Sequence, residues 1–177
     1  PYGFNILYPP YGNYYQGVCS FSGFAYAINV TSTRTKETII LNTHFSENKY
    51  NVVANKSSNI RIESCVLNGS SSNEISVMLA LSTAYKIANN LFDGGKIGLY
   101  IPGEDFSNII VPNNTFQNIS CQAIWVSGIH SSDFPVMSGL QFYCNKFESN
   151  EYDIYVGPNS SIRREQGVFE KKTAGNN

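Results

Sequence analysis

Large apolar residues recur along the chain at regular intervals, each preceded by a short polar turn and followed by an alternating apolar stretch. Six residues hold this anchor position: Phe21, Phe45, Leu67, Phe92, Phe116 and Phe147. Successive anchors are 24, 22, 25, 24 and 31 residues apart, so the period is nearly constant until an insertion lengthens the last interval. A period of this length indicates that one structural unit is repeated along the chain.

Each repeat contains apolar pairs whose members are two residues apart, which is the spacing of a strand with one buried face. A first pair follows every anchor: Ile28 with Val30, Val52 with Ala54, Ile75 with Val77, Leu99 with Ile101, Ile124 with Val126, and Ile154 with Val156. A second pair precedes most anchors: Ile60 with Ile62, Ile109 with Val111, and Leu140 with Phe142. Together with the anchor segment, this predicts three short strands per repeat.

A polar turn separates the second pair from the anchor: Asn42-Thr43, Ser64-Cys65, Asn89-Asn90, Asn113-Asn114 and Cys144-Asn145. Asn tolerates left-handed backbone, and its amide can bond the Asn of the next coil, so we expect an asparagine ladder. These features predict an all-β fold, a single-stranded right-handed parallel β-helix of about six to seven coils. An all-β sandwich also has closely spaced strands, but it gives no reason for one turn, anchor and pair to recur at a fixed spacing.

Two stretches carry a resemblance to a known family. Asn89 to Phe92 leading to Ile97 to Leu99, and Asn113 to Phe116 leading to Ile124 to Val126, resemble the right-handed β-helix repeats of carbohydrate-binding proteins and sugar hydrolases. The similarity covers roughly residues 14 to 160. It implies the fold and leaves the activity open, because that superfamily includes lyases, hydrolases, epimerases, phage tailspikes, adhesins and structural shafts.

The 177 residues form one domain, with no break in composition that marks a second. We expect an N-terminal cap or extended segment over 1–15, the β-helix over 16–169 and a flexible tail over 170–177. The coils add up to a rod of roughly 30 Å. Such a rod is short for a polysaccharide-cleaving enzyme of this type, which suggests a piece of a longer protein.

The formal charge of −1, with 14% charged residues, gives no electrostatic footprint for nucleic acid or an anionic membrane, and no stretch predicts membrane insertion. A neutral surface of hydroxyl, amide and aromatic groups is common outside cells, so an extracellular or cell-surface location is expected. Six Asn-X-Ser/Thr sequons occur. Asn113 is set aside because it is expected in the ladder, which leaves Asn29, Asn55, Asn68, Asn118 and Asn159 as possible glycosylation sites.

The four cysteines are expected to be free and mostly buried. Cys19 and Cys65 occupy the same turn column two coils apart, which is too far for a disulfide, and Cys121 and Cys144 fall in different parts of their coils. With two histidines and no Cys-x-x-Cys, a zinc site is not expected, and no cofactor is predicted.

Coils in register turn equivalent outward positions into columns. Between the members of the first pairs stand Asn29, Val53, Ser76, Tyr100, Trp125 and Tyr155. The last three predict an aromatic column, which has two interpretations. It either stabilises the sheet by stacking, or it forms a platform for sugar rings or for a partner protein.

Candidate catalytic groups are sparse. The insertion near residues 128–138 contains His130 and Asp133 beside the expected groove. Arg61 and Lys86 project from adjacent coils, and such a basic line either binds a carboxylate or interrupts an apolar edge. The acidic residues scatter over different columns, without the carboxylate clusters of β-helix lyases or hydrolases.

We therefore assign no catalytic residue. The leading hypothesis is a non-catalytic extracellular module of a surface, adhesin-like or filament protein, which binds glycan or a protein subunit of the same assembly through Tyr100, Trp125 and Tyr155. One alternative is a polysaccharide-active enzyme using the same face, with His130, Asp133, Asp153 or Arg61 as the groups to test. The other is a purely structural shaft that stacks end to end.

Overall fold

The computed structural model describes residues 2–7, 13–15, 19–32, 37–70, 73–105, 109–132 and 138–163. In these ranges every regular element is a β-strand. No helix in the described part is long and apolar enough to cross a membrane. Short strands rich in Val, Ile and Thr, joined by polar turns, account for this all-β structure.

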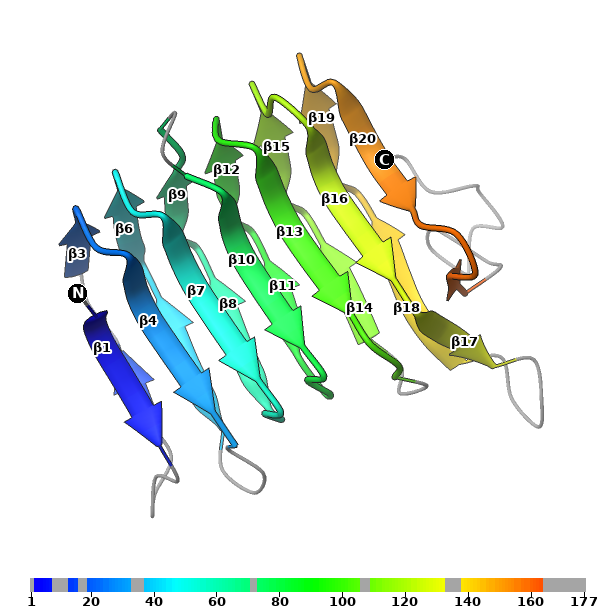
Figure 1. The fold of residues 1–177 in the computed structure, drawn as a ribbon, viewed down its shortest axis with the longest axis horizontal. Coiled ribbons are helices and arrows are strands. Elements are labelled where there is room, and N and C mark those ends of the chain that lie inside the picture. The colour runs from blue at the N-terminus through cyan, green and yellow to red at the C-terminus, as the bar shows by residue number, and fades with distance from the viewer. Residues whose placement is uncertain are drawn as a thin grey trace.

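The strands form three sheets, and Figure 1 looks onto the first, whose strands lie side by side in chain order. Sheet A contains β1 (Tyr2–Leu7), β4 (Tyr26–Thr31), β7 (Tyr50–Asn55), β10 (Ile75–Ala80), β13 (Ile97–Pro102), β16 (Gln122–Ser127) and β20 (Tyr152–Val156). Sheet B contains β2 (Asn13–Tyr15), β5 (Thr38–Leu41), β8 (Ile60–Glu63), β11 (Lys86–Ala88), β14 (Ile109–Pro112), β18 (Ser138–Tyr143), β17 (Ile129–Ser132) and β21 (Ser161–Ile162). Sheet C contains β3 (Cys19–Ser22), β6 (Thr43–Ser46), β9 (Val66–Asn68), β12 (Leu91–Asp93), β15 (Thr115–Gln117) and β19 (Lys146–Glu148).

The chain visits sheets A, B and C in turn, and each strand pairs in parallel with its equivalent in the next coil. The predicted parallel β-helix is therefore present. Among the described strands, β4 to β15 make four regular coils, fewer than the six to seven expected. The prediction counted both ends as regular repeats. At the C-terminal end, β17 enters sheet B and pairs antiparallel with β18, which breaks the simple order.

The expected N-terminal segment contributes strands of its own. Strand β1 pairs in parallel with β4, and β2 pairs in parallel with β5, so these parts of 1–15 extend sheets A and B. No repeat register in the sequence indicated these pairings. The boundaries proposed at residues 15 and 169 stay predictions, and 170–177 lie outside the described residues.

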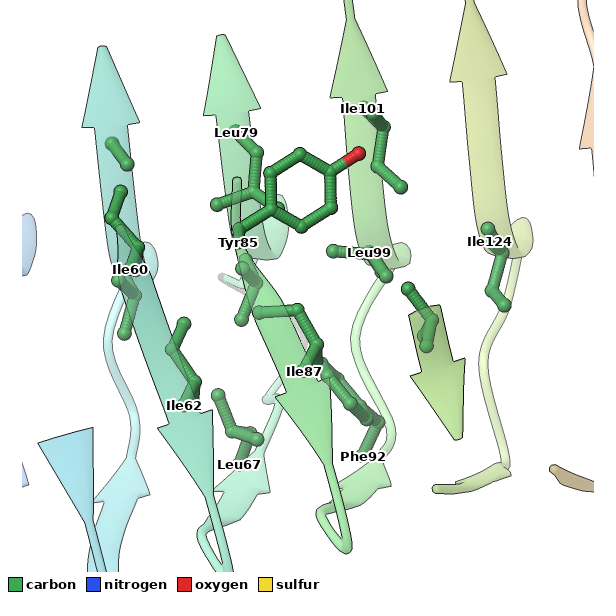
Figure 2. Packing of buried hydrophobic residues seen from close by; sticks show 14 of the residues in the cluster. Ile60, Ile62, Leu67, Leu79, Tyr85, Ile87, Phe92, Leu99, Ile101 and Ile124 are labelled. Atoms are coloured by element: carbon green, nitrogen blue, oxygen red, sulfur yellow. The ribbon is translucent and has the colours of Figure 1, made fainter. Parts of the chain in front are cut away.

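The anchors stack inside the solenoid as the period predicted. Strand pairing places Phe45 beside Leu67, Leu67 beside Phe92, and Phe92 beside Phe116. All four are fully buried, and the rings of Phe92 and Phe116 stack with centroids 4.4 Å apart. Figure 2 shows Leu67 and Phe92 in the interior together with Ile87 of β11, and all three belong to one continuous apolar cluster.

The asparagine ladder is also present. The first residue of each turn is left-handed, with φ of 57° at Asn89 and 56° at Asn113, and the second is buried. Asn114 Oδ1 accepts from the backbone N–H and the Nδ2 of Asn90, both at 3.0 Å. The Nδ2 of Asn114 donates to Asn145 Oδ1 at 3.1 Å, which continues the ladder into the next coil.

A second polar ladder, which was not predicted from the sequence, lies at the turn between sheets C and A. Asn48 Nδ2 donates to the carbonyl of Phe21 at 3.0 Å, and Asn73 Nδ2 donates to the carbonyl of Asn48 at 3.0 Å. Asn150 repeats the arrangement at the C-terminal end, where its Nδ2 donates to the carbonyl of Phe116. These amides satisfy backbone groups that the turns leave unpaired.

All four cysteines are free, as predicted. The expectation that they are mostly buried is wrong, because only Cys65 is buried. Cys19 and Cys121 are half-buried, and Cys144 is exposed. Cys144 takes the first, left-handed position of its turn, with φ of 54°, and this position faces solvent. Burial raises the pKa of the Cys65 thiol to about 11.

Candidate functional site

The outward face of sheet A carries the predicted aromatic column. Strand pairing places Tyr100 of β13 beside Trp125 of β16, and Trp125 beside Tyr155 of β20. The ring centroids of Tyr100 and Trp125 are 4.5 Å apart, and those of Trp125 and Tyr155 are 6.3 Å apart. Residues at equivalent positions of successive repeats, 25 and 30 residues apart, are therefore neighbours on one face of the solenoid.

One member of the wider column differs from the sequence prediction. In β10 the outward residue is Met78, which pairs with Val53 and Tyr100, whereas Ser76 is buried. The turn between Leu67 and β10 is longer than in the other coils, so the inward pair is Val77 with Leu79. Ile75 lies before this pair on the outward face. Apolar alternation alone cannot tell whether the inward pair is Ile75 with Val77 or Val77 with Leu79.

The three rings are not equally available to a ligand. Tyr100 and Trp125 lie 30° from coplanar at close range, so each covers part of the other's face. The indole Nε1 of Trp125 is buried and has no hydrogen-bond partner among the described residues. The hydroxyl of Tyr100 lies 3.2 Å from the hydroxyl of Ser127. Stacking thus stabilises this part of the column, in line with the structural interpretation.

The C-terminal end of the column is open. Tyr155 is 38% exposed and stands at 66° to Trp125, so its ring does not repeat the stacking of Tyr100 on Trp125. Tyr152, three residues earlier on the same strand, is 53% exposed, and its ring centroid lies 6.5 Å from that of Tyr155. Tyr152 was not predicted as a site residue. The sequence did contain a signal for it: Tyr26 and Tyr50 lie three residues before Asn29 and Val53, just as Tyr152 lies three residues before Tyr155.

Tyr152 belongs to a second outward column on sheet A. Strand pairing also places Tyr26, Tyr50, Ile75, Ile97 and Gln122 along this column, and Tyr2 of β1 pairs with Tyr26 at its N-terminal end. The rings of Tyr26 and Tyr50 stack with centroids 4.9 Å apart. The hydroxyl of Tyr50 donates to a carboxylate oxygen of Glu74 at 2.7 Å, and this bond is the main cause that raises the Tyr50 pKa to about 12.

Sheet C presents a different surface. One of its outward columns consists entirely of polar residues: Ser22, Ser46, Asn68, Asp93, Gln117 and Glu148. Sheet A instead exposes aromatic and aliphatic side chains in two neighbouring columns. Large apolar side chains are also exposed on sheet B, at Ile110 and Ile129, so the distinguishing feature of sheet A is that its exposed aromatic rings are contiguous, as in many recognition surfaces.

The groups proposed for catalysis do not converge in the described structure. His130 is buried in β17, where burial lowers its pKa and its Nε2 lies 3.4 Å from the carbonyl oxygen of Ser127. Asp153 is exposed on β20 and accepts a hydrogen bond from Asn150. Arg61 is paired with Glu63 on β8. Asp133 lies outside the described residues.

The insertion adds β17 to sheet B and does not place His130 beside the aromatic column as an exposed group. In the described part of the chain, no group of three or more His, Cys, Asp or Glu residues could hold a metal ion. No cofactor was predicted, and that expectation stays a prediction.

The sequons differ in accessibility. Asn55, Asn118 and Asn159 are exposed, whereas Asn29 and Asn68 are half-buried. Asn68 also bonds His44 through its Nδ2, at 3.0 Å from the ring Nε2. The reason for setting Asn113 aside is wrong, because the ladder uses the following residue and Asn113 is exposed. Glycosylation at any of these positions stays a prediction.

Parallel coils, stacked anchors and a buried asparagine ladder together define a β-solenoid of the parallel β-helix class. A family model described as "Right handed beta helix region" matches residues 11–147, and the chain belongs to this family. No curated protein and no solved structure gives a significant match to it.

Proposed function

We propose that the chain is a non-catalytic, extracellular β-helix module of a surface or filament protein that binds glycan through the outward face of sheet A. The observation that carries this proposal is the pair of exposed rings, Tyr152 and Tyr155, at the open end of the stacked column. Aromatic rings pack against the apolar C–H faces of sugars, while phenol hydroxyls bond sugar hydroxyls.

The surroundings of the two rings support a rigid platform. Trp125 packs against Tyr155 from the adjacent strand, and Tyr100 packs against Trp125. A ligand that rests on a preorganised surface loses less binding energy to ordering of side chains. In this arrangement Tyr152 and Tyr155 contact the sugar, and Trp125 positions Tyr155 from the neighbouring strand.

Glycan-array binding followed by calorimetry tests the proposal. We expect Tyr152→Ala and Tyr155→Ala each to cost about 1 kcal/mol, or roughly five-fold in affinity. Tyr26→Ala is the matched control, because Tyr26 lies in the same column as Tyr152 but several coils away, and it should leave binding unchanged. No glycan binding by the wild-type chain, or equal losses in all three variants, would refute the proposal.

Binding of a protein subunit through the same face is separated by a second measurement. Sedimentation of the chain across a range of concentrations reports self-association, which glycan binding does not require. Association that is lost in Tyr155→Ala, with no glycan bound by the wild type, would replace the glycan with a neighbouring subunit.

A further inference from the structure

Two hollows follow the turns that lead from sheet A to sheet B in neighbouring coils. The first, of about 380 Å³, is lined by Lys56, Ser57, Ser58, Leu81 and Thr83. The second, of about 500 Å³, is lined by Glu37, Asn59, Ile60, Arg61, Ala84 and Lys86. The two sets are adjacent in sequence at Ser58 with Asn59 and at Thr83 with Ala84, so both hollows lie along the same two turns. We call these lining residues the basic groove.

The charges of the larger hollow are organised around Glu63. Its Oε2 lies 2.6 Å from Arg61 Nη2, and its Oε1 lies 2.6 Å from Lys86 Nζ. One carboxylate therefore sits between two cations. Arg61 is the main cause that holds the pKa of Glu63 below its ordinary value, so Glu63 is ionised at neutral pH. Glu37 also lines this hollow and Lys56 lines the adjoining one, so the groove together with Glu63 carries one positive charge in excess.

Both cations keep donors that Glu63 does not use. A guanidinium has five N–H donors and an ammonium has three. The side chain of Arg61 is 37% exposed and that of Lys86 is 55% exposed, whereas the Nε of Arg61 is itself buried. Hydroxyl-bearing Ser58 and Thr83 line the adjoining hollow. The groove thus offers charged donors next to hydroxyl groups, and none of its described lining residues is aromatic.

We propose that the basic groove binds the oxyanion of an acidic saccharide, with Arg61 and Lys86 holding a carboxylate or sulfate group and the hydroxyl-lined hollow accepting the neighbouring sugar. Glu63 pairs with both cations and therefore competes with a ligand anion for them. A volume of a few hundred Å³ is in the range of small-molecule sites, about 300–1,000 Å³. This site is separate from the aromatic face of sheet A and does not depend on the function proposed for that face.

Three dextran oligosaccharides of equal length form the test: neutral, carboxymethylated and sulfated. We expect calorimetry to show binding of at least one charged probe, and Arg61→Gln and Lys86→Gln each to weaken it about ten-fold, since charge-assisted hydrogen bonds are the strong ones. The carboxymethylated and sulfated probes distinguish the two oxyanions. Charged probes that bind no more tightly than neutral dextran would overturn the proposal.

Two further variants separate a built site from general charge attraction. Glu63→Gln removes the competing carboxylate, so affinity for the anion should rise several-fold, a result that loss of folding cannot mimic. Lys146→Gln is the control, because Lys146 is also an exposed lysine paired with a glutamate, at 2.7 Å from Glu148, but lies on sheet C. Equal weakening by Lys146→Gln and Lys86→Gln would overturn the proposal. Tyr155→Ala should leave anion binding intact, which keeps the two binding proposals distinguishable.

Discussion

Replacing Asn114 with alanine removes one rung of the buried asparagine ladder. The Asn114 side chain accepts two hydrogen bonds from Asn90 and donates to the carbonyl of Ile87, the carbonyl of Pro112 and Asn145 Oδ1. All of these bonds lie within 3.1 Å and are buried. Alanine supplies none of them.

The expected loss follows from the groups left behind. The backbone N–H of Asn90 becomes a buried donor without an acceptor, which costs about 1–3 kcal/mol. The amide of Asn90 keeps its bond to Ile62 but loses the one to Asn114. The bonds from Asn114 to Ile87 and Asn145 are lost as well, at a net value of about 1 kcal/mol each. We expect Asn114→Ala to lower the free energy of unfolding by about 3 kcal/mol.

Urea unfolding followed by the fluorescence of Trp125, the single tryptophan, measures this change. The matched control is Asn113→Gly, at the neighbouring exposed position with φ of 56°, where glycine adopts the same backbone freely. The control should stay within about 0.5 kcal/mol of the wild type. A loss below about 1 kcal/mol for Asn114→Ala, or equal losses in both variants, would refute the reasoning.

Three other predictions test the packing and the buried groups. Gly98→Ala should lower the free energy of unfolding, measured by thermal melting, by about 2 kcal/mol, because a Cβ there would lie 2.6 Å from a backbone carbonyl oxygen. Gly157→Ala is the control and should be tolerated, because a Cβ there would meet only atoms at 3.4 Å or beyond. Burial lowers the pKa of His130 below its unfolded value of about 6.5, so burying the neutral imidazole costs no protonation energy above that pH and destabilises the fold increasingly below it. The urea midpoint of the wild type should therefore drop between about pH 7 and 5.5, and that of His130→Gln should drop much less. A thiol reagent should label the exposed Cys144 at once and the buried Cys65 only on unfolding, and rapid labelling of Cys65 would contradict its burial.

The repeat was readable from the sequence because it rests on local chemistry. Phe92 and Phe116 fill equivalent interior positions, and Asn90, Asn114 and Asn145 occupy equivalent turn positions at which their amides bond one another. Because these constraints recur in successive coils, they leave a periodic pattern in the sequence. The β10 register was missed because the preceding turn is longer than the others, and apolar alternation continues through Ile75 into the inward pair.

The site was less predictable for a physical reason. Strand register fixes which residues are neighbours, and it correctly brought Tyr100, Trp125 and Tyr155 together. It does not fix the rotation of each ring, which decides whether a face is covered by its neighbour or open to solvent. The exposure of Tyr152 depends on its place in the last strand of sheet A, where no further described strand of that sheet covers it.

The bridging role of Glu63 was hidden for a similar reason. Arg61 and Lys86 were placed in one column, but the carboxylate lies two residues along the strand from Arg61 and reaches both cations through its side-chain conformation. The repeat predicts which residues occupy equivalent positions in successive coils. It does not predict contacts between side chains of different columns, which depend on side-chain conformation.

Titration of the chain with the glycan selected on the array, followed by the fluorescence of Trp125, tests the central claim most directly. Trp125 lies beside Tyr155, with ring centroids 6.3 Å apart, so a sugar bound on Tyr155 should change its emission. We predict a saturable change that is lost in Tyr155→Ala and retained in Tyr26→Ala. Binding that calorimetry detects without any change in Trp125 emission, and that persists in Tyr155→Ala, would contradict a glycan site on this face.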